Sequence, residues 1–168
     1  WKETACFGES IMNELAIAKQ ENELLQLVTF GIGEEEFGID ILKVQEIIRT
    51  MAITKVPNSP PYVEGVINLR GKVIPVIDLR SRFNMDYRAH DSHTRIIVIE
   101  LHGVVIGFVV DGVSEVLRIQ SNTVETPPAV VAGIESEYIK GVGKLDDRLL
   151  ILLDLEKLIP AEEMSRQS

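Results

Sequence analysis

Short apolar runs rich in β-branched residues, separated by glycine and proline, make up most of the chain from Leu24 onward. Such runs predict β-strands rather than helices. The first five lie at residues 25–30, 37–41, 44–50, 63–69 and 72–77. The last two flank Arg70 and Gly71, a dipeptide that favours a hairpin turn. The pattern predicts an all-β fold.

Polar residues mark where this first series of strands ends. Asp78 precedes residues 79–83, and a carboxylate in that place accepts hydrogen bonds from the first turn of a helix. We therefore expect a short helix there. Residues 84–93 are polar and predict a loop.

The chain contains an internal repeat. Residues 37–49 align with residues 106–118 at a shift of 69 positions, and residues 62–79 align with 138–155 at a shift of 76. The identical residues in the first copy are Gly38, Val44, Glu46, Arg49, Tyr62, Gly65, Val66, Leu69, Asp78 and Leu79. The extra residues fall in the connecting loop, where insertions accumulate. One β-unit is therefore used twice.

Each copy holds roughly five strands and a short terminal helix. A unit of about 65–70 residues is only marginally stable alone, so we expect the two copies to pack together. Five short, twisted strands tend to close into a small barrel, which removes open edges. We expect barrels at about 24–93 and 94–160, with chain ends free to cross over, and a groove between them for a partner.

The two ends of the chain stand apart from this repeat. The sequence begins Trp-Lys-Glu-Thr-Ala-Cys and its first methionine is Met12, so we expect residues 1–11 to be a leader foreign to the native chain. The alternative is a native, frayed N-terminal extension. Apolar spacing over residues 10–24, with Ser10 as cap, predicts a short amphipathic helix. Residues 1–23 are thus leader and helix, and residues 161–168 a tail.

A net charge of −9 narrows the choice of partners. An acidic chain is not expected to bind nucleic acid or an anionic membrane. No apolar run approaches the roughly 20 residues that a membrane-spanning helix needs. A single cysteine, Cys6, excludes an internal disulfide and a thiolate zinc cluster. We expect a cytoplasmic protein.

Phosphate-binding and metal-binding motifs are weak. Residues 31–33 lack the third glycine of a dinucleotide fingerprint and run into three glutamates. Residues 141–143 repeat a glycine of the first copy, Gly65, so both glycines indicate structural turns or bulges. His90 and His93 lie in the polar loop, and we interpret them as solvated rather than as metal ligands. His102 precedes a glycine and predicts a turn.

Two sets of residues have the side-chain types of a catalytic site, but their positions in the sequence argue against that role. Asp91, Ser92 and His93 are sequence neighbours, and neighbours seldom reach the geometry of a triad. Glu46 and Asp78 could form a carboxylate pair, but Asp78 recurs in a capping position in both copies. We expect no catalytic residue, no metal and no cofactor.

The copies differ at the hairpin tip. Arg70 aligns with Asp146, so the barrel does not dictate an arginine there. A guanidinium at a tip can pair with a carboxylate on a partner, or it can be solvated or paired within the chain. The sequence favours neither recognition of a partner nor a solvated or internally paired arginine. Glu46 recurs as Glu115, which favours a structural role for that pair.

Four segments carry a family resemblance. Residues 37–49, 65–80, 109–117 and 149–153 resemble the CheW family of bacterial chemotaxis coupling proteins, and the similarity covers about residues 24–164. The resemblance implies two tandem five-stranded SH3-like β-barrels with short terminal helices. It implies no catalysis.

The resemblance also implies partners and contact residues. Family members couple the cytoplasmic tips of methyl-accepting chemoreceptors to the regulatory domain of the histidine kinase CheA, so the chain would sit at the membrane only through receptor arrays. Matched by motif, the receptor-binding residues are Val44, Glu46, Arg70 and Val73. The resemblance extends the expected receptor surface to Asn68 and Gly71 of the turn and to Thr94, which opens the second copy. The kinase-binding residues are Arg49, Thr50, Met51 and Ile53.

Other interpretations stay open. The chain could be a fragment of a kinase regulatory domain, or the coupling half of a protein fused to a phospho-receiver. From a different class, it could be a small enzyme or ligand-binding barrel that uses the groove between the repeats, which would require converging polar groups in a pocket.

Overall fold

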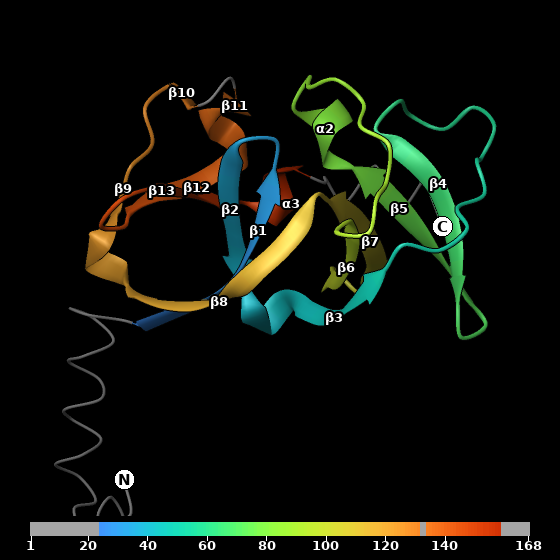
Figure 1. Cartoon of the computed structure of the whole chain (residues 1–168), viewed down its shortest axis with the longest axis horizontal. Coiled ribbons are helices and arrows are strands. Elements are labelled where there is room, and N and C mark those ends of the chain that lie inside the picture. The colour runs from blue at the N-terminus through green and yellow to red at the C-terminus, as the bar shows by residue number, and fades with distance from the viewer. Residues whose placement is uncertain (1–23, 132–133, 159–168) are drawn as a thin grey trace, which may run out of the picture.

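The computed structural model describes residues 24–131 and 134–158 (Figure 1). The expected leader, N-terminal helix and C-terminal tail lie outside these residues. None of the described helices is both long and apolar enough to cross a bilayer. The elements in chain order are β1 (Leu24–Ile32), β2 (Glu35–Asp40), η2 (Ile41–Lys43), β3 (Val44–Arg49), β4 (Val63–Leu69), β5 (Lys72–Asp78), α2 (Leu79–Arg82), β6 (Arg95–Leu101), β7 (Val104–Val110), β8 (Gly112–Gln120), η3 (Ser121–Thr123), β9 (Val124–Glu125), β10 (Val130–Val131), β11 (Ile134–Glu135), η4 (Ser136–Tyr138), β12 (Ile139–Lys144), β13 (Leu149–Leu153) and α3 (Leu155–Leu158).

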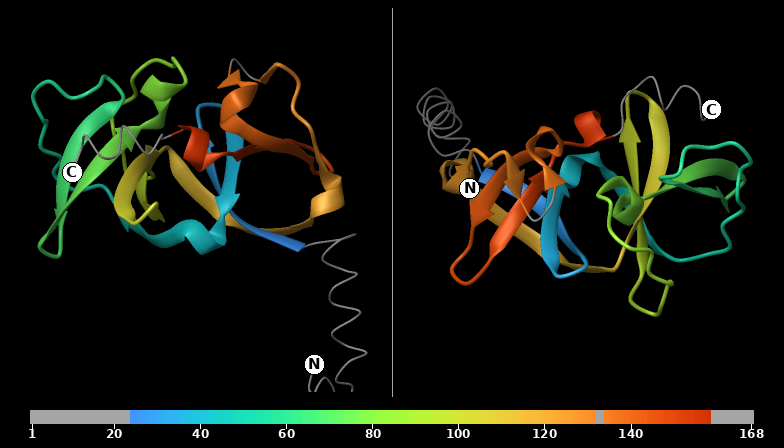
Figure 2. Two further views of the ribbon diagram at one scale, coloured as in Figure 1. Left: turned by 180° about the vertical axis from the view of Figure 1, so that it is seen from behind. Right: turned by 90° about the horizontal axis from the view of Figure 1, so that it is seen from above.

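Two barrel-like sheets lie side by side (Figures 1 and 2). Barrel one is the five-stranded sheet with the order β3-β6-β7-β5-β4, and barrel two has the order β8-β1-β2-β13-β12-β9. The tandem all-β architecture is confirmed. Barrel two exceeds the expected five strands because the two-residue strand β9 pairs with β12.

The repeat is visible as an exchange of strands between the barrels. The first copy supplies β1 to β5 and α2, and the second supplies β6 to β8, β12, β13 and α3. Each barrel combines the first hairpin of one copy with the later strands of the other, through parallel pairs β5–β7 and β2–β13. A division of the chain at residues 93 and 94 therefore falls inside barrel one, because β6 and β7 join β3, β4 and β5 there.

The main core lies between the barrels and joins them. Phe30 and Phe37 of barrel two stack with ring centroids 5.9 Å apart, and Phe30 lies 5.7 Å from Phe108 of barrel one. All three rings are fully buried. Each barrel has a smaller interior of its own. Because the shared core contains side chains from both sheets, neither barrel is expected to be stable alone.

Two glycines stand at equivalent bulges. The register of the β4–β5 pair shifts next to Gly65, and that of β12–β13 shifts next to Gly141. A Cβ on Gly65 would lie 2.3 Å from the carbonyl oxygen of Thr54, and one on Gly141 would lie 2.3 Å from a methyl carbon of Val124. The bulge interpretation of both glycines is confirmed, and the close approach of a neighbouring segment is its reason.

The short terminal helices form as predicted. The side chain of Asp78 accepts a hydrogen bond from the backbone N–H of Arg80, which caps α2. At the end of this helix, the Arg82 guanidinium lies 4.6 Å from the ring centroid of Tyr62 and 5.4 Å from that of Tyr138. Its Nε donates to the carbonyl of Leu158 in α3. Arg82 therefore ties the ends of the two copies together.

Candidate functional site

The tip of the β4–β5 hairpin holds Arg70 in a defined orientation. Arg70 and Gly71 have φ angles of 52° and 86°, which are typical of a two-residue hairpin turn of type I′. The Asn68 side chain accepts a hydrogen bond of 2.9 Å from the backbone N–H of Gly71. The hairpin expected at this place is confirmed, and its turn presents the arginine on a rigid element.

Arg70 forms an ion pair with Glu46. The guanidinium donates to a carboxylate oxygen of Glu46 on β3, at the opposite edge of the barrel-one sheet from β4. Both side chains remain partly open to solvent, so the pair contributes roughly 0–1 kcal/mol to stability. This contact describes the free chain, whereas pairing of Arg70 with a carboxylate on a partner stays a prediction. The arginine is paired internally, and its carboxylate partner is itself accessible.

Apolar side chains lie beside this ion pair. Val73 stands opposite Asn68 in the hairpin, with 69% of its surface exposed. Val44 is half-buried against the shared core. We call Val44, Glu46, Asn68, Arg70, Gly71 and Val73 the tip surface. Sequence reasoning missed Ile47, which is exposed on β3 and follows Glu46 in the chain.

Thr94 does not belong to the tip surface. Its side chain is only 5% exposed, and its hydroxyl accepts a hydrogen bond from the backbone N–H of Asp91. Thr94 directly precedes Arg95, whose partner in the β3–β6 pair is Arg49, whereas Val44 pairs with Ile99 farther along β6. The residue therefore closes a turn at the other end of the strand, away from the tip surface, and its receptor contact stays a prediction.

The predicted kinase-binding residues follow the end of β3. Arg49 and Met51 are exposed, and Thr50 is half-buried. Ile53 differs, because it packs against the interior of barrel one. The next residue, Thr54, pairs with Val66 of β4 through two backbone hydrogen bonds. Of the four predicted kinase-binding residues, Arg49 and Met51 are therefore the exposed ones.

Barrel two carries a counterpart of the Glu46–Arg70 pair. Glu115 aligns with Glu46, and Arg148 at the β12–β13 tip lies 3.3 Å from its carboxylate and 2.7 Å from that of Glu36. The alignment places Asp146 at the position of Arg70, but Arg148, two residues later, reaches the carboxylate of Glu115.

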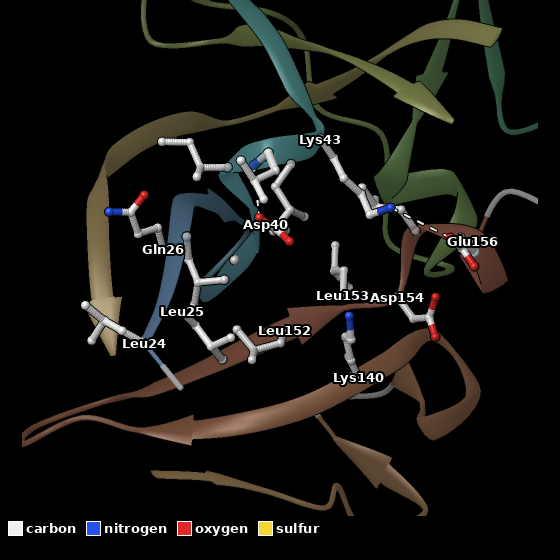
Figure 3. A pocket seen from close by; sticks show the side chains of 16 residues that line it. Leu24, Leu25, Gln26, Asp40, Lys43, Lys140, Leu152, Leu153, Asp154 and Glu156 are labelled. Carbon is white, nitrogen blue, oxygen red and sulfur yellow. Dashed lines mark hydrogen bonds and ion pairs between the residues drawn. The ribbon is translucent and has the colours of Figure 1, made fainter. Parts of the chain in front are cut away.

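A cavity of about 500 Å³ lies against the crossover between the two sheets (Figure 3). Its walls are mostly leucine side chains of β1 and β13 together with residues of β2, η2 and α3. Among its polar residues, Asp40 accepts a hydrogen bond from the backbone N–H of Leu42, and Lys43 lies 3.7 Å from Glu156. These side chains serve the local fold, so they give no support to the enzymatic interpretation.

The histidines confirm the predictions only in part. His102 has a φ of 52° and occupies the β6–β7 turn, as predicted. His93 is exposed. His90 is not a solvated loop residue, because its Nε2 lies 3.0 Å from Oε1 of Glu64 and both side chains are largely buried. Within residues 24–131 and 134–158, no group of three or more His, Cys, Asp or Glu side chains is placed to hold a metal ion.

Comparison with known proteins decides the family. A family model described as a CheW-like domain matches residues 26–163, which is most of the chain. The chain belongs to the CheW-like family. The resemblance found in the sequence is thereby confirmed.

Individual members show the same relationship. The chain is 43% identical over 140 residues to "Chemotaxis protein CheW" of Klebsiella aerogenes, covering 83% of this chain and 84% of the relative. It is 38% identical over 148 residues to that of Thermotoga maritima, covering 88% and 94%. A solved structure, the scaffolding protein TtCheW of Thermoanaerobacter tengcongensis, superimposes with a TM-score of 0.76 at 40% identity, covering 83% and 90%.

A second charged cluster surrounds Asp111 in this CheW-like fold. Asp111, at the junction of β7 and β8, accepts hydrogen bonds from the Arg80 guanidinium at 2.6 Å and from the Gly33 backbone N–H at 2.7 Å. Arg88 adds a contact at 3.1 Å. Burial pushes the pKa of Asp111 upward, but these hydrogen bonds and arginine charges outweigh it and lower the pKa. The cluster holds α2 and the loop after it against the β1–β2 turn.

Proposed function

We propose that this chain is a non-enzymatic cytoplasmic adaptor that couples chemoreceptor tips to the regulatory domain of the kinase CheA. Family membership over residues 26–163 supports the adaptor class. The observation that carries the proposal is the tip surface, where a paired arginine and an exposed valine stand together on a rigid hairpin. This arrangement fits a docking surface better than a catalytic centre.

The receptor partner is an α-helical hairpin with an apolar stripe and a carboxylate. Val73 and the exposed part of Val44 receive the apolar stripe, in the way that grooves receive amphipathic helices. When the receptor binds, Arg70 either leaves Glu46 and pairs with the receptor carboxylate, or it contacts both carboxylates. Because charge-assisted pairs are strong and directional, this exchange contributes specificity more than affinity.

The kinase partner uses the opposite end of β3. Arg49 pairs with the first residue of β6, whereas Val44 pairs with Ile99 near the other end of that strand. Residues 49–51, at and just after the end of β3, are thus separated from the tip surface by the length of that strand. Two partners can bind at once, which is what coupling requires.

A charge reversal tests the receptor surface. We expect Arg70→Glu to weaken binding of a receptor-tip fragment by about tenfold or more, because a repulsive contact replaces an attractive one. Arg148→Glu, the matched change in barrel two, should leave receptor binding unaltered. Binding is measured by titration calorimetry, with circular dichroism to confirm the fold. Equal receptor binding by Arg70→Glu and the wild type would contradict the proposed surface.

A reciprocal variant tests the kinase segment. Met51→Glu places a charge on the exposed segment after β3, and we expect it to weaken binding of the kinase regulatory domain while receptor binding persists. Loss of both partners together would indicate a damaged fold, and retention of both would remove this segment from the kinase interface.

A further inference from the structure

Two arginines face each other on barrel one. Arg49, the last residue of β3, lies directly opposite Arg95, the first residue of β6, in the antiparallel pair that these strands form. Side chains that are directly opposite in such a pair point to the same face, with Cβ atoms about 4.5–5.5 Å apart. Two positive charges in this arrangement repel each other. We call Arg49 and Arg95 the arginine pair.

No carboxylate among the described residues neutralises the arginine pair. Arg49 is exposed and forms neither a hydrogen bond nor an ion pair with any of them. Glu46 and Glu100, the acidic residues of these two strands, lie farther along the strands. Each already has a side-chain partner there. The positive charge is therefore uncompensated, although the chain as a whole carries a net charge of −9.

Backbone carbonyls fix the orientation of the Arg95 guanidinium. Its Nη1 donates hydrogen bonds of 2.8 Å to the carbonyl oxygens of Ser92 and Thr94. Its Nε and Nη2 have no hydrogen-bond partner among the described residues. The Arg95 side chain is half-buried, so binding a ligand costs it less conformational entropy than it costs a fully exposed arginine. Arg95 thus presents unused donors from a fixed position.

The fold does not require the second arginine. The shift of 69 positions that relates the copies aligns Arg49 with Arg118 and Arg95 with Gln26. Gln26 and Arg118 are themselves directly opposite each other in the β1–β8 pair of barrel two. Barrel two therefore forms the equivalent cross-strand pair with a single positive charge. The repulsion between two arginines is a feature that distinguishes barrel one at this position.

The chemistry of two neighbouring guanidinium groups suits an oxyanion. Each group presents N–H donors that form bidentate hydrogen bonds with a carboxylate or a phosphate, and arginine keeps its charge throughout the physiological pH range. An oxyanion between the two side chains replaces their repulsion with two attractive contacts. We propose that the arginine pair is a binding site for one oxyanion, a carboxylate or a phosphate group. This site does not depend on the proposed function.

The oxyanion has two possible sources. Arg49 begins the segment over residues 49–51, which we propose to bind the kinase regulatory domain. A carboxylate of that domain would make Arg95 a further contact residue, which the sequence motifs did not reveal, and this source rests on the proposed function. The other source is a free phosphate. Both present the same chemistry to the arginine pair, so the experiment has to separate them.

Nuclear magnetic resonance of the guanidinium groups tests the site in the full chain. The Nε–Hε signals are followed while inorganic phosphate replaces chloride at constant ionic strength, so that the screening of charges stays the same. We expect the signals of Arg49 and Arg95 to shift along one saturation curve with a Kd on the order of 10 mM. The signal of Arg118 should not saturate.

Two variants exchange the pairs of the two barrels. Arg95→Gln gives barrel one the pair of barrel two, and we expect the Arg49 signal then to need at least about tenfold more phosphate, because one of the two charged partners is gone. Gln26→Arg is the converse change and should make the Arg118 signal saturate. An Arg49 curve that is the same in Arg95→Gln and the wild type, or shifts of equal size without saturation at all three arginines, would overturn the proposal.

Binding of the kinase regulatory domain then identifies the source. A loss of affinity of about tenfold in Arg95→Gln, with Arg118→Gln equal to the wild type, assigns a carboxylate of that domain to the site. An affinity that Arg95→Gln leaves unchanged assigns a free anion. Either result, after saturation with phosphate, supports the oxyanion site. A regulatory domain that does not bind the wild type would contradict the proposed function, whereas the phosphate titration alone decides the site.

Discussion

The two barrels contain equivalent strands in the same order, with β9 added in barrel two, but they differ in the charged residues at their tips. In each, an edge-strand glutamate pairs with an arginine at a hairpin tip, and a glycine bulge admits a neighbouring segment. The tip of barrel one carries Arg70 and Lys72, whereas that of barrel two adds Asp146 and Asp147. What the barrels share belongs to the fold, and recognition is more reasonably sought where they differ.

The terminal helices show the same contrast with reversed charges. Arg80 of α2 binds Asp111 at 2.6 Å, and the residue aligned with Arg80 in the second copy is Glu156, which lies 3.7 Å from Lys43. Asp111 is 17% exposed, but Glu156 is 57% exposed. The same location is thus a buried network on one side and a loose surface pair on the other. The Arg80–Asp111 pair should therefore contribute more to the free energy of unfolding than the Lys43–Glu156 pair.

The largest difference in stability between equivalent variants of the two barrels is expected at the bulge glycines, Gly65 and Gly141. Gly65→Ala should lower the free energy of unfolding by about 3 kcal/mol, because its Cβ would strike the Thr54 backbone, which also bonds to Val66. Gly141→Ala should cost about 1 kcal/mol, because its nearest contact is a Val124 methyl that can shift. Urea denaturation measures both. Equal losses would show that the two bulges are equally tight.

The next largest difference in stability is expected at the ion pairs of the two terminal helices, Arg80–Asp111 and Lys43–Glu156. Asp111→Asn should cost about 2 kcal/mol at neutral pH, because it leaves Arg80 without its buried charged partner, whereas Glu156→Gln should cost less than about 0.5 kcal/mol. Asp111 has a lowered pKa, so its contribution is present above the ordinary aspartate value of 3.8 and is lost as the pH falls through the folded-state value. Urea denaturation should therefore show the wild type and Asp111→Asn converging in acid. A difference that persists at low pH would contradict this explanation.

Arg82 breaks the symmetry where the two copies meet, since Leu158 occupies the aligned position. Arg82→Ala removes a guanidinium beside two tyrosine rings and a hydrogen bond to Leu158, and should cost about 1.5 kcal/mol. Arg82→Lys keeps the charge without the planar group and should recover part of that loss. Thermal unfolding compares the two. Equal melting temperatures for both variants and the wild type would mean that the junction does not depend on this residue.

The sequence predicted the elements well because their signals are local. Arg70 and Gly71 predicted the hairpin, Asp78 predicted the helix cap, and the repeat predicted two barrels. The exchange of hairpins was not predictable from the same signals, because a parallel pair such as β2–β13 joins residues more than a hundred positions apart.

The candidate site was predictable in its residues but not in its pairings. Motif placed Glu46 and Arg70 on one surface, yet the equivalent pair in barrel two escaped alignment because Arg148 reaches Glu115 from a shifted position. Thr94 and Ile53 were assigned from position alone, and both face inward. Burial of a residue at the end of a strand depends on the segment that covers it, which one sequence does not reveal.

The most direct test of the docking account is to map the receptor-binding face by NMR. Backbone amide signals of the full chain are followed during titration with a receptor-tip helical hairpin. The account predicts that the largest shifts fall on β3 and on the turn around Arg70, while the aligned residues of β8 and the β12–β13 tip stay unchanged. Shifts concentrated around Glu115 and Arg148, or spread equally over both tips, would contradict it.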